Sequence, residues 1–377
     1  MIPYGRHHIT EEDIESVTAV LKSEFLTSGP LVPRFENQIC KVTNSNFSTA
    51  VNSCTSGLHI ACMAIGLKAG DILWTSPISF VASASCGLFC GANVDFIDID
   101  EETALLSITK LKDKLKEAEQ KNLLPKVIIP VHFAGQPCDM KEIYDLSKKY
   151  GFRIIEDAAH ALGASYDGQP VGNCSYSDIT VFSLHPVKII TSGEGGVATT
   201  NDPNLQKKMQ LLRSHGVERD VSEMRNDPDG PWSYEIKDFG FNYRMTDIAA
   251  ALGISQLKKL NDFVSKRRLI SETYDQEFLN TSINFLKQKS NRYSSHHLYV
   301  IKIKRERRDD VFNILINAGI GVQVHYIPIY KFDIFDTQSN YPSSENYYEE
   351  CITIPLYPNL SNYEIEYVID TIKNIEL

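Results

Sequence analysis

The chain has 377 residues, with 38 Lys and Arg against 48 Asp and Glu, so its formal net charge is −10. Its 42% hydrophobic and 23% charged residues are typical of a globular protein and argue against a disordered chain. A net acidic chain without runs of Lys or Arg is poorly suited to binding a phosphate backbone, so we expect no nucleic-acid partner.

The start of the chain and its apolar runs give no sign of export or membrane insertion. Residues 1–8 contain one Arg and are not followed by the apolar segment of a secretory signal. The apolar runs fall below the ~18–20 residues that span a bilayer. The eight cysteines include no C-x-x-C pair and no accompanying His cluster, so we expect reduced thiols and no metal site. We therefore expect a cytoplasmic protein with no membrane partner.

The first half of the chain alternates short apolar strands with helical patterns. The predicted strands are 48–52, 71–75, 94–98, 127–131, 153–156, 179–182 and 196–200. Predicted helices between them are 58–65, 80–90, 109–121 and 139–150. This alternation predicts an α/β fold with a mostly parallel sheet covered on both faces. In such sheets ligands bind at the carboxyl ends of the strands.

The pattern changes in the last third of the chain. Helices are predicted at 246–257 and 263–278, followed by strand 298–303, helix 307–318, strand 322–325 and a final helix at 364–374. We interpret this block as a small α+β domain (261–377) beside a large domain (1–260). Residues 1–30 are expected to pack on the small domain or to reach across a dimer. Residues 221–232, rich in charge, Pro and Gly, are predicted to form a mobile surface loop.

Residues suited to pyridoxal phosphate chemistry follow the predicted strands. Asp157 ends one strand, and Lys188 follows the next together with a Gly-rich stretch at 191–196. A lysine amine can form a Schiff base with the cofactor aldehyde, and a carboxylate can keep the pyridine nitrogen protonated. Alone, Asp157 would be a turn residue and Lys188 a surface lysine; their joint placement at one sheet edge favours the functional interpretation.

The remaining parts of such a site are also present. A cofactor phosphate needs hydroxyls and the N–H groups of a helix N-terminus, which Thr55, Ser56 and Ser183 can supply. Phe80 stands at a strand end where an aromatic face could stack on the ring, and His160 follows Asp157 on the next turn. Thr55 and Ser56 alone could be only a helix cap, and His160 a packed core histidine.

Several stretches in chain order resemble the DegT/DnrJ/EryC1/StrS family of nucleotide-sugar aminotransferases. They are residues 156–163, 182–188, 193–196, 211–216, 240–247 and 324–326. The resemblance spans nearly the whole chain. It implies the aspartate aminotransferase-like fold (fold type I), pyridoxal 5'-phosphate as cofactor, and a homodimer with active sites at the dimer interface.

The resemblance also implies roles for individual residues. Lys188 matches the catalytic Schiff-base lysine, Asp157 the partner of the pyridine nitrogen, and His160 the position beside the ring hydroxyl. Ser183, Thr55 and Ser56 match the phosphate binders, and Phe80 the stacking aromatic. Asn242 matches an asparagine that the other subunit lends to the phosphate. His325 and Tyr326 match a loop near the sugar nucleotide. Leu184 and Ser192 depart from the family pattern, where an aromatic residue and Thr are commoner.

Stretches 26–29, 76–82, 295–299 and 319–330 are similar to family members of pseudaminic acid biosynthesis. This likeness implies that L-glutamate donates its amino group to carbon 4 of a UDP-linked 4-keto-6-deoxy-N-acetyl-L-hexosamine. Three alternatives stay open. One is a GDP-4-keto-6-deoxymannose substrate with a perosamine-type product; another is a non-catalytic binding protein on the same fold. The third, a sugar dehydratase of the family, is disfavoured because those members replace the lysine by histidine.

Overall fold

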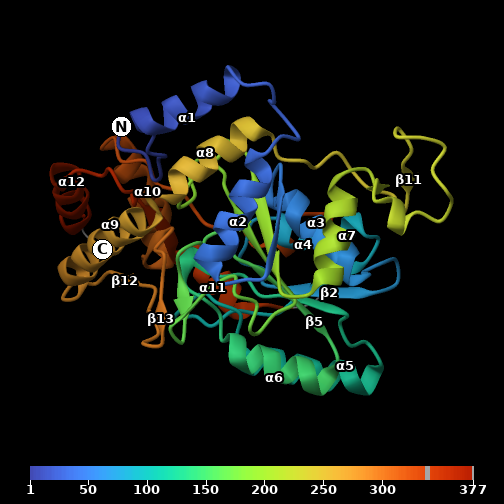
Figure 1. Cartoon of the computed structure of the whole chain (residues 1–377). Coiled ribbons are helices and arrows are strands. Elements are labelled where there is room, and N and C mark those ends of the chain that lie inside the picture. Colours follow the sequence, from blue (N-terminus) through green and yellow to red (C-terminus); the bar gives the residue numbers. More distant parts are fainter. Residues whose placement is uncertain (336–339, 376–377) are drawn as a thin grey trace.

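The computed structural model describes residues 1–335 and 340–375 (Figure 1). Its centre is a sheet of seven strands in the order β1–β9–β8–β5–β4–β2–β3. These strands are β1 (Phe47–Val51), β2 (Ile72–Thr75), β3 (Asn93–Phe96), β4 (Val127–Ile129), β5 (Arg153–Asp157), β8 (Ile179–Ser183) and β9 (Gly196–Thr200). Within this sheet β9 alone runs antiparallel to its neighbours β1 and β8. The mostly parallel α/β sheet predicted from the sequence is confirmed.

Alternating residues of the central strands pack against helices on opposite faces of the sheet. Leu73 and Val127 belong to a buried cluster with α3 (Cys54–Ile65), α4 (Ala82–Phe89) and α7 (Pro203–Arg213). The next residues along these strands, Trp74 and Ile128, belong to a second cluster with α5 (Ile108–Lys121) and α6 (Met140–Tyr150). Because successive strand side chains point to opposite faces, this alternation covers the sheet on both sides.

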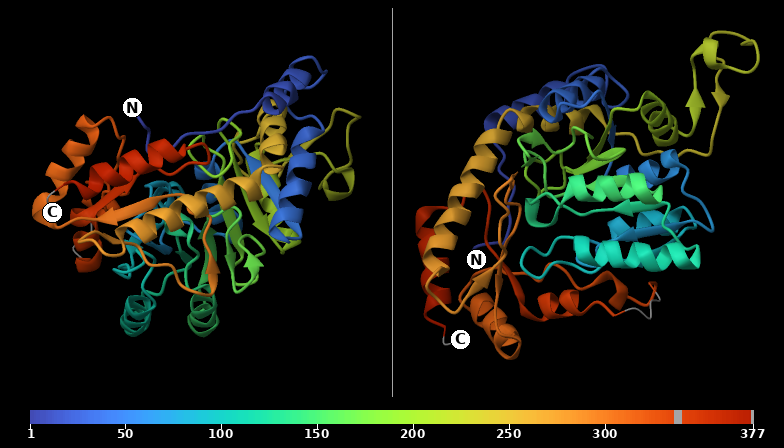
Figure 2. Two further views of the ribbon diagram at one scale, coloured as in Figure 1. Left: turned by 90° about the vertical axis from the view of Figure 1, so that its left-hand side faces the viewer. Right: turned by 90° about the horizontal axis from the view of Figure 1, so that it is seen from below.

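A third cluster covers the β1–β9–β8 end of the sheet. It joins Ala50, Phe182 and Val197 to α2 (Leu31–Thr43), α8 (Asp247–Leu257) and the first turns of α9 (Leu260–Phe278). The later turns of α9 pass into a separate buried cluster of the C-terminal part, which contains Tyr274 and Phe278. Figure 2 shows α9 as a long helix running between the two parts of the chain. One helix therefore contributes to both cores.

The C-terminal core is built on the sheet β12–β14–β15. Its elements are β12 (Asn284–Phe285), β14 (Tyr299–Lys302), β15 (Cys351–Ile354), α10 (Arg305–Asn317) and α12 (Asn362–Lys373). Helix α11 (Pro342–Glu350) instead contributes Tyr347 to the cluster of α5 and α6. The strand predicted at 322–325 is wrong, because only Gln323 forms a β-bridge there, with Thr353. The preceding Gly321 instead donates its N–H to the Ile2 carbonyl at 2.7 Å. The boundary at 260 stays a prediction.

The N-terminal segment crosses from one core to the other. The N–H of Ile2 bonds the Gly319 carbonyl at 2.8 Å, and the Tyr4 carbonyl accepts from the N–H of Leu356 at 3.0 Å. Further on, α1 (Glu11–Leu21) lies against α8, where Asp13 accepts from Gln256 at 2.8 Å. The segment therefore contacts both parts of the chain on its way past the site described below.

Short elements complete the described part of the chain. They are β6 (Ser165–Tyr166), β7 (Gln169–Pro170), β10 (Val217–Glu218), β11 (Glu235–Ile236), β13 (Arg292–Tyr293), η1 (Phe133–Gly135), η2 (Val221–Glu223) and η3 (Ile329–Lys331). The β10–β11 hairpin projects away from the body of the molecule in Figure 2. It carries the loop predicted at 221–232. Among the described residues, no helix combines the length and apolar character that crossing a membrane requires.

Candidate active site

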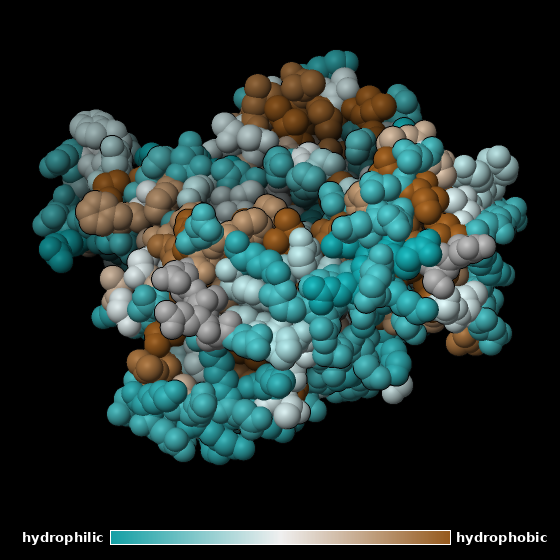
Figure 3. Space-filling view, turned by 180° about the vertical axis from the view of Figure 1, so that it is seen from behind, coloured by the Kyte–Doolittle hydropathy of each residue, from teal (hydrophilic) through white to brown (hydrophobic). Residues whose placement is uncertain are grey.

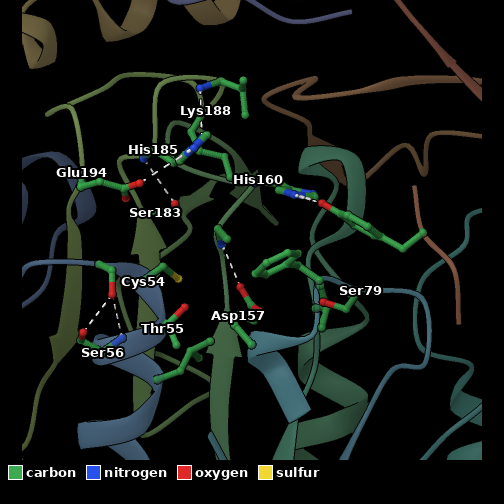
Figure 4. Close-up of a pocket in the computed structure, with 18 of the residues that line it drawn as sticks. Cys54, Thr55, Ser56, Ser79, Asp157, His160, Ser183, His185, Lys188 and Glu194 are labelled. Atoms are coloured by element: carbon green, nitrogen blue, oxygen red, sulfur yellow. Dashed lines mark hydrogen bonds and ion pairs between the residues drawn. The ribbon is translucent and has the colours of Figure 1, made fainter. Parts of the chain in front are cut away.

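A cavity of about 670 Å³ opens where the carboxyl ends of β1, β5 and β8 meet (Figure 4). The sequence-predicted residues that line it are Thr55, Ser56, Phe80, Asp157, His160, Ser183, Lys188, His325 and Tyr326. They come from strand ends, from the first turn of α3 and from the C-terminal part of the chain. Segments that are far apart in the sequence thus converge on one cavity.

The first turn of α3 forms an anion-binding end of this cavity. Ser53 caps the helix by accepting the N–H of Ser56 at 3.1 Å, while the N–H groups of Cys54 and Thr55 have no acceptor within the described residues. A helix N-terminus with free N–H groups attracts an anion. Gly196 lets β9 approach this turn, since a Cβ there would lie 2.6 Å from the Cys54 nitrogen.

Asp157 is buried at the end of β5 and held by two hydrogen bonds. Its Oδ2 accepts from the Ser83 hydroxyl at 2.6 Å, and its Oδ1 accepts from the N–H of Ala159 at 3.0 Å. Only 5% of Asp157 is exposed. The carboxylate is therefore oriented by its surroundings before any ligand binds. Such orientation is required of a group that must contact a single ring nitrogen of a cofactor.

Lys188 lies on the cavity wall after β8, opposite Asp157 in Figure 4. Burial lowers the pKa of its ammonium group to about 8, and the negative charge of Asp157 opposes part of that shift. Its Nζ is 3.5 Å from Nε2 of His297. A lysine with a lowered pKa supplies a neutral amine near neutral pH, which is the form that attacks an aldehyde.

His160 is a neutral histidine with a defined tautomer. Burial, with the charge of Lys188, holds its pKa well below the usual value. Its Nδ1 accepts the N–H of Ala134 at 3.3 Å, so the ring proton sits on Nε2. Nε2 is 3.2 Å from the hydroxyl oxygen of Tyr326, to which it donates. The hydroxyl hydrogen of Tyr326 is therefore free to donate elsewhere in the cavity.

The C-terminal wall of the cavity is aromatic. His325 is anchored by the Thr353 hydroxyl, 2.8 Å from its Nδ1, and its ring centroid lies 5.2 Å from that of Tyr4. Phe80, across the cavity, has its ring centroid 6.4 Å from that of Tyr326, and 60% of Phe80 is exposed. A flat ligand would meet aromatic surface on this side.

Asn242 is the one sequence-predicted residue that does not line the cavity. It is exposed, forms a β-bridge with Ser214, and its carbonyl accepts from the Asn52 side chain at 3.4 Å. Within one chain it does not reach the α3 turn as a ligand. Its assignment to the active site of a second subunit stays a prediction.

Several residues with a place at the site escaped the sequence reasoning, and three of them make contacts that the structure shows plainly. Ser83 orients Asp157, His297 contacts Lys188, and Tyr4 lines the cavity beside His325. Ser83 comes three residues after Phe80, so the one-turn spacing of a helix could have found it. Tyr4 and His297 carry no local signal, because they reach the site only through packing between distant segments.

Pyridoxal 5'-phosphate fits this set of donors. The free N–H groups of the α3 turn, with Thr55 and Ser183, suit its phosphate, and the buried Asp157 suits its ring nitrogen. The amine of Lys188 suits its aldehyde. These three features lie around one cavity large enough for a cofactor and a substrate together.

Comparisons with known proteins agree with this geometry. The model of the DegT/DnrJ/EryC1/StrS aminotransferase family matches residues 7–373. The UDP-4-amino-4,6-dideoxy-N-acetyl-beta-L-altrosamine transaminase of Campylobacter jejuni serotype O:23/36 is 37% identical over 382 residues, covering 100% of this chain and 97% of the relative.

Two solved structures are similar along almost the whole chain. Helicobacter pylori PseC, an aminotransferase involved in the biosynthesis of pseudoaminic acid, has a TM-score of 0.90 and 30% identity, covering 98% of each chain. The PLP form of Spr1654 from Streptococcus pneumoniae has a TM-score of 0.88 and 30% identity, covering 99% of this chain and 97% of that one.

Proposed function

The chain belongs to the DegT/DnrJ/EryC1/StrS aminotransferase family, and from this membership we propose its reaction. It transfers the amino group of L-glutamate to carbon 4 of a UDP-linked 4-keto-6-deoxy-N-acetyl-L-hexosamine, the aminotransfer step of pseudaminic acid biosynthesis. The full-length relative named as the corresponding transaminase supports this substrate. The cofactor is pyridoxal 5'-phosphate, in keeping with the family and with the donor set of the cavity.

One observation carries the chemistry: a lysine with a lowered pKa and a buried carboxylate share the cavity. When bound, pyridoxal phosphate supplies an aldehyde that takes up the amino group and a ring that accepts electrons from the substrate carbon. Asp157 holds a proton at the ring nitrogen. Lys188 Nζ takes the proton from the amino-donor carbon and delivers a proton at carbon 4 of the sugar.

The other lining residues bind and orient. The N–H groups of Cys54 and Thr55, with the Ser183 hydroxyl, bind the phosphate at the positive end of α3. His160 donates a hydrogen bond to the Tyr326 hydroxyl oxygen. The hydroxyl hydrogen of Tyr326 can then donate to a ligand in the cavity. Phe80 and Tyr326 present aromatic surface to a flat ligand from two sides of the cavity.

The acting unit is a homodimer with shared active sites. Large apolar side chains are exposed on two parts of the surface, which supports a partner there. One is the projecting hairpin with the residues just after it, where Trp232 is 72% and Phe239 is 89% exposed. The other lies at the end of α1 and the loop after it, the apolar patch at the top of Figure 3, where Leu21 and Phe25 are exposed. Asn242 is exposed and follows this hairpin, and we assign its side chain to the cofactor phosphate of the second copy.

A visible absorbance spectrum of the purified protein tests the proposal. Bound pyridoxal phosphate absorbs visible light. That absorbance falls on addition of L-glutamate and returns on addition of the UDP-linked 4-keto sugar. Lys188→Ala abolishes both changes, whereas Lys141→Ala, at an exposed lysine on α6, leaves them intact. Return with a GDP-linked 4-keto sugar alone would reassign the substrate. A protein that takes up no cofactor would overturn the reaction.

A further inference from the structure

Ser79 is a buried residue of the cavity wall that the proposed reaction does not yet use. It precedes α4, about one helical turn before Ser83, and only 4% of it is exposed. Ser79 lines the cavity (Figure 4), whereas Ser83 is fully buried and does not. Their two hydroxyl oxygens are 2.6 Å apart. Ser79 therefore connects the cavity wall to the residue that orients Asp157.

The direction of this hydrogen bond follows from the other contacts of Ser83. A serine hydroxyl has one hydrogen to donate. Ser83 has two further acceptors within reach, Asp157 Oδ2 at 2.6 Å and the Phe80 carbonyl oxygen at 3.3 Å. The carboxylate is the closer of the two and is charged, so it takes the hydrogen. Ser83 then accepts from Ser79, and Ser79 is the donor of the bond between them.

The hydrogen bond from Ser79 restricts how the Ser83 hydroxyl can turn. It occupies one lone pair of the Ser83 oxygen, which keeps the Ser83 hydrogen directed toward Asp157. Without it the hydroxyl is free to rotate toward the Phe80 carbonyl, which already lies within hydrogen-bond distance. Hydrogen bonds in a chain also polarise one another, so the bond from Ser79 strengthens the bond that Ser83 donates.

Asp157 depends on this chain because its carboxylate has few other partners. Within the described residues it accepts one hydrogen bond at each oxygen, from Ser83 at Oδ2 and from the N–H of Ala159 at Oδ1. A buried carboxylate oxygen that loses its donor is left unsatisfied, which costs free energy. The hydrogen-bond chain from Ser79 through Ser83 is therefore the side-chain support of Asp157 in this part of the chain.

We propose that Ser79 is a positioning residue of the aminotransfer reaction, which acts on Asp157 through Ser83. This inference rests on the proposed function, in which Asp157 contacts the ring nitrogen of pyridoxal phosphate. Ser79 holds the Ser83 hydrogen on the carboxylate, and the carboxylate then keeps one orientation while the cofactor binds. Ser79 has no hydrogen left to donate into the cavity, so it offers a ligand only an acceptor. The cofactor phosphate, which needs donors, binds at the α3 turn and not beside Ser79.

A double-mutant cycle on cofactor affinity, measured by equilibrium dialysis with pyridoxal phosphate, tests the proposal. We expect Ser79→Ala to weaken binding about fivefold, against about tenfold for Ser83→Ala. Because Ser79 acts through Ser83, the double variant should bind no more weakly than Ser83→Ala alone. Ser79→Thr keeps the hydroxyl and should bind as the unaltered protein does. A loss of about fiftyfold in the double variant would mean that the two serines act independently, which would overturn the proposal.

The carboxyl carbon of Asp157 gives a second readout that needs no cofactor. The cofactor-free protein is isotopically labelled at the side-chain carboxyl carbons of its aspartates and measured by NMR, and Asp157→Asn assigns the resonance. We expect Ser79→Ala and Ser83→Ala to displace this resonance in the same direction, with no further displacement in the double variant. Ser85→Ala, on the same helix, should leave it in place. A resonance that Ser79→Ala does not displace would contradict the proposal.

Phe80→Leu separates the positioning role from mere support of the turn before α4. This change removes the aromatic ring beside Ser79 in the sequence, so it should weaken cofactor binding while the Asp157 resonance stays in place. If Ser79→Ala behaves like Phe80→Leu, Ser79 only supports the turn that carries Phe80, and its positioning role is rejected. An unaltered protein that binds no pyridoxal phosphate would overturn the proposed function. The carboxyl resonance would still decide whether Ser79 acts on Asp157.

Discussion

Nζ of Lys188 lies 3.5 Å from Nε2 of His297, so the lysine has a buried imidazole as its neighbour. His297 is 4% exposed, and burial together with the neighbouring His160 and Lys188 holds its pKa well below the usual value. A neutral imidazole accepts a hydrogen bond without adding a positive charge beside the lysine. His297 therefore gives the amine a defined position while leaving it unprotonated.

We expect His297→Leu to lower kcat about tenfold, which corresponds to the loss of one hydrogen bond of about 1.4 kcal/mol. KM for L-glutamate should change little, because His297 does not line the cavity. His297→Gln should restore part of the rate, since its amide oxygen can accept from Lys188. Steady-state kinetics with L-glutamate measure these effects.

His296→Leu is the matched control for this change. His296 is also buried and adjacent in sequence, but the hydrogen bond to Lys188 is made by His297. If both leucine variants lower kcat equally, loosened packing explains the loss. The positioning role of His297 would then be rejected.

Ser83→Ala should weaken the binding of pyridoxal phosphate about tenfold. The Ser83 hydroxyl donates to Asp157 at 2.6 Å, and a hydrogen bond to a charged group is worth about 1.5–3 kcal/mol. Without it, Asp157 is less well oriented toward the ring nitrogen. Equilibrium dialysis of the cofactor-free protein measures the change. Ser85→Ala, on the same helix, should leave the affinity unaltered, and an equal loss in both variants would contradict the assignment.

The pKa of Lys188 predicts how its reactivity depends on pH. Burial lowers this pKa from 10.5 to about 8, so the amine loses its proton at lower pH than an ordinary lysine. In the cofactor-free protein, labelling of Lys188 by an amine reagent should rise about tenfold between pH 7 and pH 9 and level off above it. Lys141 is the control, because its pairing with Asp145 raises its pKa. A Lys188 that titrates together with Lys141 would contradict the lowered pKa.

The lowered pKa of Lys188 also makes the stability of the folded chain depend on pH. The folded chain disfavours the protonated form of Lys188, so the protonated lysine lowers the free energy of unfolding below pH 10.5, and the penalty grows as pH falls toward 8. Below about pH 8 the penalty is constant. The negative charge of Asp157 reduces this penalty because it stabilises the protonated Lys188. A bound cofactor reduces it further because it gives the neutral amine a partner.

Regular elements with a clear period could be predicted from the sequence. The strands of the central sheet lie close to their predicted positions because they are short apolar runs that are mostly buried on both faces, and α5 and α6 because each buries one apolar face. Helix α8, which is buried on most sides, also lies close to its predicted position. α7 was missed although Asp202 caps it by accepting the N–H of Asn204 at 2.8 Å, and Pro203 opens its first turn. The two-residue strands β6, β7, β12 and β13 carry no periodic signal at all.

Site residues at the ends of neighbouring strands could be predicted from the sequence. Site residues that reach the cavity only through packing between distant segments could not. Asp157, Ser183 and Thr55 follow strands of one sheet, so a parallel arrangement brings them together. His297 is placed beside Lys188 by contacts between distant segments and not by a strand of the sheet. The buried Arg267 on α9 donates to the carbonyls of His297 and Leu356 at 3.2 and 2.8 Å, which ties that loop to the helix. No local pattern reports such a contact.

The proposed homodimer can be tested at Phe239, which follows the projecting hairpin by three residues. This side chain is 89% exposed, and a glutamate in its place would have to be buried without a partner if a second copy covers it. We therefore expect Phe239→Glu to raise the dimer dissociation constant about 100-fold, measured by light scattering over a dilution series. Because Asn242 follows the hairpin, cofactor affinity should fall in step with dissociation. Tyr363→Glu, at a residue 76% exposed on α12, should leave the dimer intact. A dimer unaffected by Phe239→Glu would place the interface elsewhere.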